Sequence, residues 1–496
     1  MIVNKLNKQD IKDEIILKSD LAGEFPIYLY ISDAKDYIIY STSIEKILNH
    51  EDVIKPLKVS EEGISFLLQS GVVPLPKTMY ENIFIISIGT TATIKVNQNQ
   101  IKIDFDFNFP FLNKDRGSEK PDKDKILDLL AEATISRIDK SKKTYLFHSA
   151  GKDSNMIALA LHKAKYKEDI TLVTYKSQDE TKDESAISKS IADKLNFKHK
   201  ILNLPKQLNE DDYKNIENYF SNIPFLTVDN ATLAYPLYSS QIDFHDTNII
   251  DGMGNDVYIG HIPGKTEFLM QKYLSKFSFL SKFNILKSEH KINSLLKLRH
   301  ENTGLNGFNQ FDSIKIFNQS INTKKNWKSE SNLKNYLDLR AHIRGIHIDQ
   351  EIFIRKVRNF SDLNRSHLIL PWMNEEVVKY LFTIDKGYLF DEKELKNKLI
   401  LRDILKEDLD LDSDKLGKKG YAFDYWKILV LMGDKVRDEI LSCKLWDNKE
   451  IKVLIDRLYL NLEKKPKRAS KIKSLIHRLY LISAWYNHNK YIKKND

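Results

Sequence analysis

The chain has 496 residues, of which 42% are hydrophobic and 30% charged, as in a folded globular protein of roughly two to three domains. Its 78 basic and 69 acidic residues give a formal charge of +9 but are interspersed, which favours a mixed solvated surface over a nucleic-acid-binding face. The single cysteine, Cys443, excludes an intrachain disulfide and any multi-cysteine zinc or iron–sulfur site.

The sequence shows no targeting or membrane signal. No apolar run approaches the length that spans a bilayer, and the first eight residues lack the apolar core of a signal peptide. Cys443 lies in a late helical pattern without a glycine-rich or histidine context, which favours a packed thiol over a nucleophile. We therefore expect a cytoplasmic protein with neither a membrane nor a nucleic acid as partner.

The first part of the chain is dominated by β-type patterns. Such segments are expected at residues 26–41, 83–88, 91–96 and 101–107. A serine-capped helix is predicted at 60–68. A small β-rich domain is therefore predicted for residues 1–112. The polar segment that follows contains Gly117 and Pro121, as a linker would.

From about residue 120, strand and helix patterns alternate. Strands are expected at 145–147, 170–175 and 200–204, and helices at 126–138, 155–163, 184–195, 348–357, 375–382, from 398 and from 426. This alternation predicts an α/β fold in which helices cover both faces of a parallel sheet, with ligands at the carboxyl ends of the strands. Residues 120–496 are interpreted as one domain, and the lysine-rich stretch at about 264–339 is expected to be a solvated helical insertion.

A hydrophobic strand at 145–147 runs directly into a small polar loop. The loop consists of Ser149, Ala150, Gly151, Lys152, Asp153 and Ser154. Its first three residues leave backbone N–H groups accessible, and a helix follows at once, so the junction is a candidate anion site. Lys152 precedes an aspartate and not Ser or Thr, which differs from the P-loop pattern. Asp153 could carry a magnesium ion, although a capped strand-to-helix turn is the structural alternative.

The pattern recurs near residue 250. A short apolar strand enters a loop that contains Gly252 and Gly254 and ends at Asp256. Two acid-bearing loops on one sheet could share a metal, whereas a simple glycine turn is the alternative. Further along the chain, Lys418 and Lys419 in a glycine-bracketed loop offer two ammonium groups to phosphate, although exposed lysines are usually only solvated.

In this order and spacing, these segments resemble the asparagine synthetase family, which includes β-lactam synthetase and the lasso-peptide macrolactam cyclases. The resemblance covers most of the chain. It is carried by Ser-Ala-Gly-Lys-Asp-Ser at 149–154, Asp-Gly-Met-Gly-Asn-Asp at 251–256, Lys-Leu-Ile-Leu-Arg at 398–402 and Lys-Lys-Gly-Tyr at 418–421.

The resemblance implies an ATP pyrophosphatase fold with ATP and Mg²⁺ as cofactors. Asp153 and Asp256 would bind magnesium, and Lys418 would act on the phosphates and on the charge that develops as the amide forms. The implied phosphate-binding positions are Ser149, Ala150, Gly151, Lys152, Asp153, Ser154, Gly252, Gly254 and Lys419.

The departures from the family pattern guide the choice of substrate. Ile2 stands where glutaminases of the family carry a nucleophilic cysteine, so residues 1–112 are expected to be a degenerate amidotransferase-like scaffold. Met253 stands where asparagine-forming enzymes carry glutamate, and Asp251 replaces a serine. Glu351 falls near the glutamate by which β-lactam and carbapenam synthetases orient or deprotonate the attacking nitrogen. A solvent-facing helix residue is the equal alternative for Glu351.

We therefore expect an ATP-dependent carbon–nitrogen ligase that adenylates a carboxylate for attack by an amine of the same substrate. Macrolactam formation in a lasso-type peptide, as in antibiotic biosynthesis, is the favoured reaction. The expected partners are a peptide or small-molecule carboxylate, a precursor peptide and a processing protease. The alternatives are an ammonia-using asparagine synthetase homologue, a β-lactam synthetase-like enzyme and an inactive binding protein. A tRNA-directed pyrophosphatase is disfavoured because no basic, aromatic-rich RNA module is present.

Overall fold

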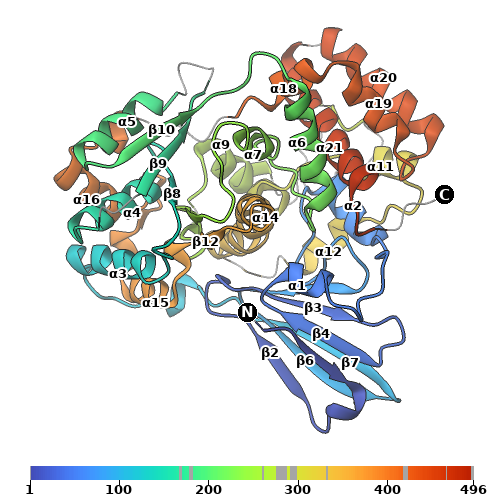
Figure 1. The fold of residues 1–496 in the computed structure, drawn as a ribbon, viewed down its shortest axis with the longest axis horizontal. Helices are drawn as coiled ribbons and strands as arrows, with labels where there is room; N and C mark the ends of the chain where they lie inside the picture. The colour runs from blue at the N-terminus through green and yellow to red at the C-terminus, as the bar shows by residue number, and fades with distance from the viewer. Residues whose placement is uncertain are drawn as a thin grey trace.

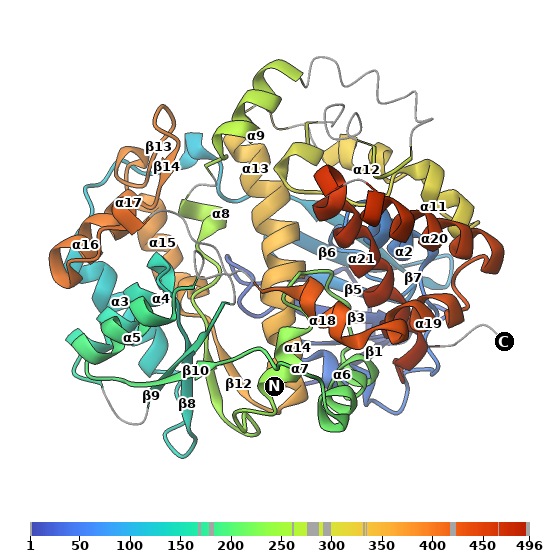
Figure 2. The same cartoon turned by 90° about the horizontal axis from the view of Figure 1, so that it is seen from above.

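Figures 1 and 2 show the computed structural model of the chain. The residues that it describes are 2–166, 170–177, 183–259, 262–274, 287–290, 299–330, 333, 335–416, 423–464 and 466–492. An antiparallel β-rich region lies near the N-terminus, and a parallel sheet flanked by helices begins at residue 144.

The N-terminal region holds two antiparallel sheets with a hydrophobic cluster between them. Their orders are β1-β4-β3-β5 and β2-β6-β7. The strands are β1 (Asn4–Asn7), β2 (Ile15–Lys18), β3 (Ile27–Ile31), β4 (Tyr37–Ser41), β5 (Ile83–Ile86), β6 (Thr90–Asn97) and β7 (Gln100–Phe107). Leu29, Ile38 and Ile94 belong to the cluster between the sheets. The β-rich prediction is confirmed, but the sequence does not reveal the edge strand β1, because its residues are largely polar and its register comes from β4.

The second sheet is wholly parallel, with the order β10-β9-β8-β11-β12. Its strands are β8 (Thr144–Phe147), β9 (Ile170–Tyr175), β10 (Lys198–Leu202), β11 (Asn248–Ile250) and β12 (His367–Ile369). The predicted α/β class and parallel sheet are confirmed. The edge strand β12 is an addition, since residues 367–369 lie between two predicted helices.

Helices flank both faces of this sheet (Figure 1). On one side lie α3 (Lys123–Ile135), α4 (Lys152–Lys163) and α5 (Ser185–Lys194), and on the other α7 (Ala234–Tyr238) and α14 (Arg355–Leu363). Successive strand residues point to opposite faces. Phe147 of β8 therefore points away from α4, and its ring lies 6.0 Å from that of Tyr235 and 6.3 Å from that of Phe360.

A long helical rod runs between the parallel sheet and the C-terminal helices (Figure 2). It begins as α13 (Tyr336–Arg340), passes through the π-helical segment Ala341–Ile354 and ends as α14. Within the π-helical segment and α14, the sequence predicts only residues 348–357 as helix, because π-helical winding moves the apolar period away from 3.6 residues. Gly345 packs the rod closely against α8 (Asp256–Ile259), since a Cβ there would come within 2.6 Å of the Val257 side chain.

The C-terminal part is helical, as predicted, with α18 (Tyr425–Met432), α19 (Asp434–Ser442), α20 (Asn448–Lys464) and α21 (Ala469–His488). Cys443 is buried there, and burial raises the pKa of its thiol to about 12, in keeping with a packed side chain. No helix in the described ranges is long and apolar enough to cross a membrane.

The described part of the stretch 264–339 contains helices joined by irregular segments, but the expectation of a solvated insertion is wrong for α12 (Thr323–Glu330). Trp327 of this helix is buried, and its ring meets Phe66 of α2 (Glu61–Gln69) edge to face. Its indole N–H donates to Ser70 Oγ at 2.8 Å. This helix therefore packs against the N-terminal region and contributes to the core.

Candidate functional site

The strand order creates a topological switch point between β8 and β11. From β8 the chain continues to β9 and β10 on one side, whereas β11 and β12 lie on the other side. In open parallel sheets a crevice forms at the carboxyl ends of the strands at such a point. The loop after β8 enters α4 and the loop after β11 enters α8. The two loops that the sequence singles out therefore meet at this crevice.

Two glycines shape the meeting of the loops. A Cβ added at Gly252 would lie 2.9 Å from the backbone nitrogen of Ser154, so the loops pack backbone to backbone. Gly254 has a φ of +114°, which L side chains rarely adopt, and a Cβ there would overlap the side chain of Met373. Both positions therefore require glycine for the loops to keep their shape.

The buried residue His148 holds the first loop in place through Asn155. Nε2 of His148 lies 2.9 Å from Oδ1 of Asn155, and the Asn155 amide donates to the carbonyls of Ser149 and Gly151. Because Oδ1 of that amide is an acceptor, Nε2 carries the proton, and Nδ1 accepts from Ser188 Oγ at 2.6 Å. Burial lowers the pKa of His148 to about 3, so the ring is neutral and holds the loop in place.

Side-chain oxygens accept hydrogen bonds from three backbone N–H groups of the loop. The N–H of Ser149 donates to Ser154 Oγ at 3.3 Å, and that of Gly151 donates to Ser149 Oγ at 3.0 Å. The N–H of Ala150 donates to Oε2 of Glu184, at the start of α5, at 3.0 Å. An incoming anion would compete with the Glu184 carboxylate for this last donor.

A lysine ties the two loops together. Nζ of Lys398 lies 2.7 and 2.8 Å from the two carboxylate oxygens of Asp153, 2.8 Å from Oδ1 of Asp256 and 2.9 Å from Oδ1 of Asn255. Burial disfavours the charged ammonium, but the two carboxylates more than offset this and raise the pKa of Lys398. The site therefore contains one protonated lysine between two carboxylates.

The chemistry of these donors suits a divalent cation. Two carboxylates and the amide oxygen of Asn255 are hard oxygen ligands of the kind that Mg²⁺ prefers. Among the described residues no group of three or more His, Cys, Asp or Glu side chains could hold a metal, so a bound ligand would have to supply further oxygens. Nζ of Lys398 takes the position between the carboxylates, so a cation could bind there only after the lysine moved.

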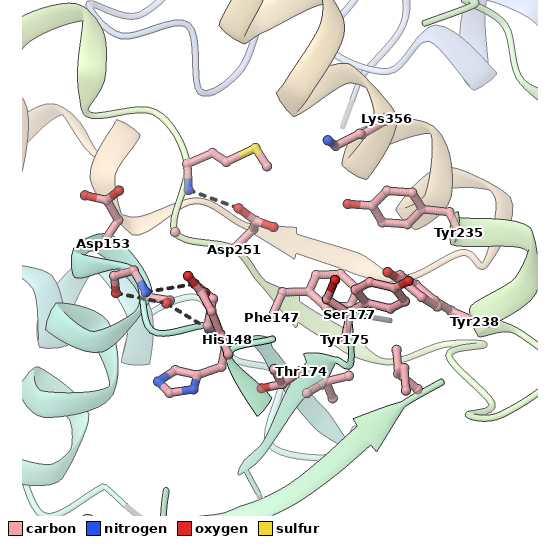
Figure 3. Close-up of a pocket in the computed structure, with 18 residues that line it drawn as sticks. Phe147, His148, Asp153, Thr174, Tyr175, Ser177, Tyr235, Tyr238, Asp251 and Lys356 are labelled. Atoms are coloured by element: carbon pink, nitrogen blue, oxygen red, sulfur yellow. Dashed lines mark hydrogen bonds between the residues drawn. The ribbon is translucent and has the colours of Figure 1, made fainter. Parts of the chain in front are cut away.

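A pocket of about 220 Å³ opens beside the loops at the carboxyl ends of β8, β9 and β10 (Figure 3). Its apolar and aromatic wall includes Phe147, Val173, Tyr175, Leu202, Tyr235 and Tyr238. Loop residues such as Asp153 and Ser154 line the polar side. An apolar cavity next to convergent polar groups is the usual form of a small-molecule site.

Two further charged residues, an acid and a lysine, line this pocket. Asp251 is buried, accepts from the N–H of Met253 at 3.0 Å, and has a pKa raised to about 6 by burial. Lys356 of α14 reaches the pocket from the opposite side (Figure 3), and its Nζ lies 2.7 Å from Oδ1 of Asp229.

The structure brings together most of the site residues predicted from the sequence. Those that line the pocket are Ser149, Gly151, Asp153, Ser154 and Gly252. Ala150 and Gly254 lie in the same two loops, Lys152 is the first residue of α4, and Asp256 lies across Lys398 from Asp153. The predicted Lys418 and Lys419 lie outside the described residues.

Sequence reasoning assigns no role to Glu184, Asp251, Lys356 or Lys398. Only Lys398 carries a usable signal. It stands directly before the amphipathic helix α16 (Leu399–Leu409), where the helix dipole disfavours a cation, so a lysine at that place indicates a specific partner. Its partner Asp153 is far away in the sequence, and local spacing cannot reveal it.

The predicted Glu351 lies apart from the two loops. It lines a different, smaller cavity, whose other walls come mainly from residues 67–85 and from Phe225 and Leu226. Its carboxylate pairs with Arg355 at 2.9 Å, and Arg355 donates to the hydroxyl of Tyr28 at 2.6 Å. In this conformation Glu351 joins the helical rod to the N-terminal sheets. Its proposed role towards an attacking amine remains a prediction.

We expect Arg355→Met to lower the free energy of unfolding by about 3–5 kcal/mol, because the change leaves a mostly buried Glu351 carboxylate without its partner. Urea unfolding followed by circular dichroism measures this change. Lys379→Met is the control, since Lys379 pairs with Glu375 on an exposed helix face and its loss should have little effect. Equal stability of the two variants would show that the Arg355 cluster does not anchor the N-terminal region.

No family model matches the chain, and no curated protein matches it. The functional argument therefore depends on the site itself. That site combines two strand-to-helix loops, a carboxylate pair with the ammonium group of Lys398 between them, and an adjoining, mostly apolar pocket.

Proposed function

We propose that the chain is an ATP-dependent carbon–nitrogen ligase of the ATP pyrophosphatase type, which adenylates a carboxylate, releases pyrophosphate and forms an amide. The observation that carries the proposal is the meeting of two strand-to-helix loops at the switch point, with Asp153 and Asp256 around one cation and a mostly apolar pocket beside them. A nucleoside triphosphate needs hydrogen-bond donors for its phosphates, a positive counter-charge and an apolar site for its base. Groups suited to these three needs lie next to one another here.

Each part of the nucleotide has a suitable place. The apolar end of the pocket, with Val173, Tyr175 and Leu202, would hold the base. The phosphates would lie at the first loop, where they would take the N–H of Ala150 from Glu184. Asp153 and Asp256 would hold Mg²⁺, which when bound neutralises charge on the leaving pyrophosphate.

The remaining predicted residues keep the roles that the family resemblance implies. Lys418 and Lys419 would attract the phosphates, and Lys418 would also stabilise charge on the tetrahedral intermediate. His148 and Asn155 would keep the loop carbonyls and N–H groups fixed as the ligand binds. A cytoplasmic location belongs to the same proposal, because ATP is supplied there.

The attacking amine is proposed to belong to the substrate itself. Ile2 stands where the resembled glutaminases need cysteine, so this chain would not generate ammonia from glutamine. Asp251 places a carboxylate in the pocket that would attract a protonated amine. A peptide that carries both an amine and a carboxylate meets these requirements, as in macrolactam formation in a lasso-type peptide. A precursor peptide and a processing protease are the partners that this reaction implies.

The nucleotide products test the proposal. Purified protein would be incubated with Mg²⁺, ATP labelled at the α-phosphate, and a candidate peptide encoded beside its gene. We expect labelled AMP and unlabelled pyrophosphate in equal amounts, and little AMP without the peptide. ADP and phosphate as the only products would overturn the proposal. Direct titration with α,β-methylene-ATP tests nucleotide binding separately, without any need for the peptide.

A further inference from the structure

The ammonium group of Lys398 is surrounded by oxygens in the manner of a bound cation. Four oxygens lie 2.7–2.9 Å from Nζ, two from Asp153 and one each from Asp256 and Asn255. The residue is 5% exposed, and its backbone is left-handed, with φ 57° and ψ 43°. A non-glycine residue in this conformation is strained, and such strain persists only when surrounding contacts fix the residue in place.

We propose that Lys398 and a divalent cation bind at the same place between Asp153 and Asp256, so that free metal is excluded until a nucleotide draws the lysine away. Two cations cannot share these oxygens. A metal at its usual short distance from the same carboxylates would lie against the ammonium group, and their repulsion in a buried site is poorly screened.

The exclusion has a consequence for the order of binding. With Lys398 in place, the two carboxylates and one ammonium give a local charge of −1, which alone would repel a triphosphate. A metal–nucleotide complex brings both the cation that replaces the ammonium and the phosphate oxygens to which the ammonium can turn. The lysine therefore favours the metal–nucleotide complex over the free metal. This second step depends on the proposed function, whereas the exclusion of free metal does not.

The lysine can be replaced without leaving its partners fully buried. The side chains of Asp153 and Asp256 are 29% and 37% exposed, so water can reach both carboxylates once the ammonium is gone. Lys398→Met keeps an unbranched side chain, one atom shorter, and removes its charge. It therefore vacates the cation position with little change of shape.

The experiment is a titration of each variant with Mn²⁺ alone, followed by electron paramagnetic resonance of the free ion. We expect Lys398→Met to bind one Mn²⁺ at least tenfold more tightly than the wild-type protein. The double variant Asp153→Asn/Lys398→Met should lose this gain. Equal Mn²⁺ affinity of the wild-type protein and Lys398→Met would overturn the proposal.

A second comparison does not depend on the folding of Lys398→Met. In the absence of nucleotide, Asp153→Asn should leave the Mn²⁺ isotherm of the wild-type protein unchanged, because the carboxylate is engaged by Lys398. Loss of a bound Mn²⁺ in Asp153→Asn would overturn the proposal. Titration of each variant with Mn²⁺ in the presence of α,β-methylene-ATP distinguishes the exclusion of free metal from the proposed binding of a nucleotide. A gain of Mn²⁺ binding in Lys398→Met without any binding of the nucleotide analogue would support the exclusion and contradict the proposed function.

Discussion

Asp153→Asn is expected to reduce AMP formation at least a hundredfold. The Asp153 carboxylate accepts from Nζ of Lys398 and, at 2.6 Å, from Nδ2 of Asn255. An asparagine there would turn an NH₂ group towards one of these donors and could not pair with a cation. Removal of one group that stabilises transition-state charge typically costs 10²–10³-fold in rate. The assay is the release of AMP from ATP labelled at the α-phosphate.

Asp256→Asn should act in the same direction, because Asp256 holds the same ammonium group from the other loop. Asp104→Asn is the matched control, since Asp104 pairs with two lysines on the N-terminal sheet and does not line the pocket. The control should retain full activity. If Asp153→Asn retained activity within threefold of the wild-type protein, the two loops would not be the place of nucleotide chemistry.

The sequence predicts the parallel sheet and the meeting of the two loops at its carboxyl edge because both follow from local patterns. Short apolar runs alternate with helical patterns, and small residues follow the strands that become β8 and β11. The rule that ligands bind at the carboxyl ends of parallel strands then places the two loops at one edge. No long-range information is needed for this step.

The parts that the sequence does not reveal depend on partners far away in the chain. The three residues of β12 become a strand only because Asn248–Ile250 offers a parallel edge. Gly345 looks like an interruption of a helix, yet it lies inside a continuous rod because Val257 packs against it. Trp327 looks like part of a polar, lysine-rich stretch until α2 covers its ring.

The residues at the centre of the site show the same limit of prediction from the sequence. Local patterns identify Asp153 and Asp256 as acids on adjacent loops, and an oxygen-binding metal is the simplest counter-charge for them. The counter-charge that the described residues provide is Lys398, which follows Asp153 by 245 positions. The placement of two acids on neighbouring loops can therefore be predicted from the sequence, whereas the residue that lies between them is known only from the folded chain.

The proposed reaction predicts a product that is lighter than the substrate peptide by the mass of one water, formed without ammonia or glutamine. Ile2 stands where the glutaminases that the chain resembles carry the cysteine that releases ammonia. Asp251 provides the pocket with a carboxylate to which a substrate amine could bind. An amine tethered to the activated carboxylate also has the advantage of proximity, since effective molarities of about 10⁵–10⁸ M are reached in well-oriented intramolecular reactions.

Mass spectrometry of the peptide after incubation with ATP, Mg²⁺ and the processing protease measures this outcome. The protease-cleaved peptide, with its free amines acetylated after the cleavage, is the control, and it should yield pyrophosphate with no dehydrated product, because activation needs only the carboxylate. Asp153→Asn should yield neither. A product in which an amino group replaces a carboxylate oxygen, or strict dependence on added ammonium, would reject the intramolecular reaction in favour of asparagine-type synthesis. Such a result would leave the adenylation step intact, since AMP would still be released.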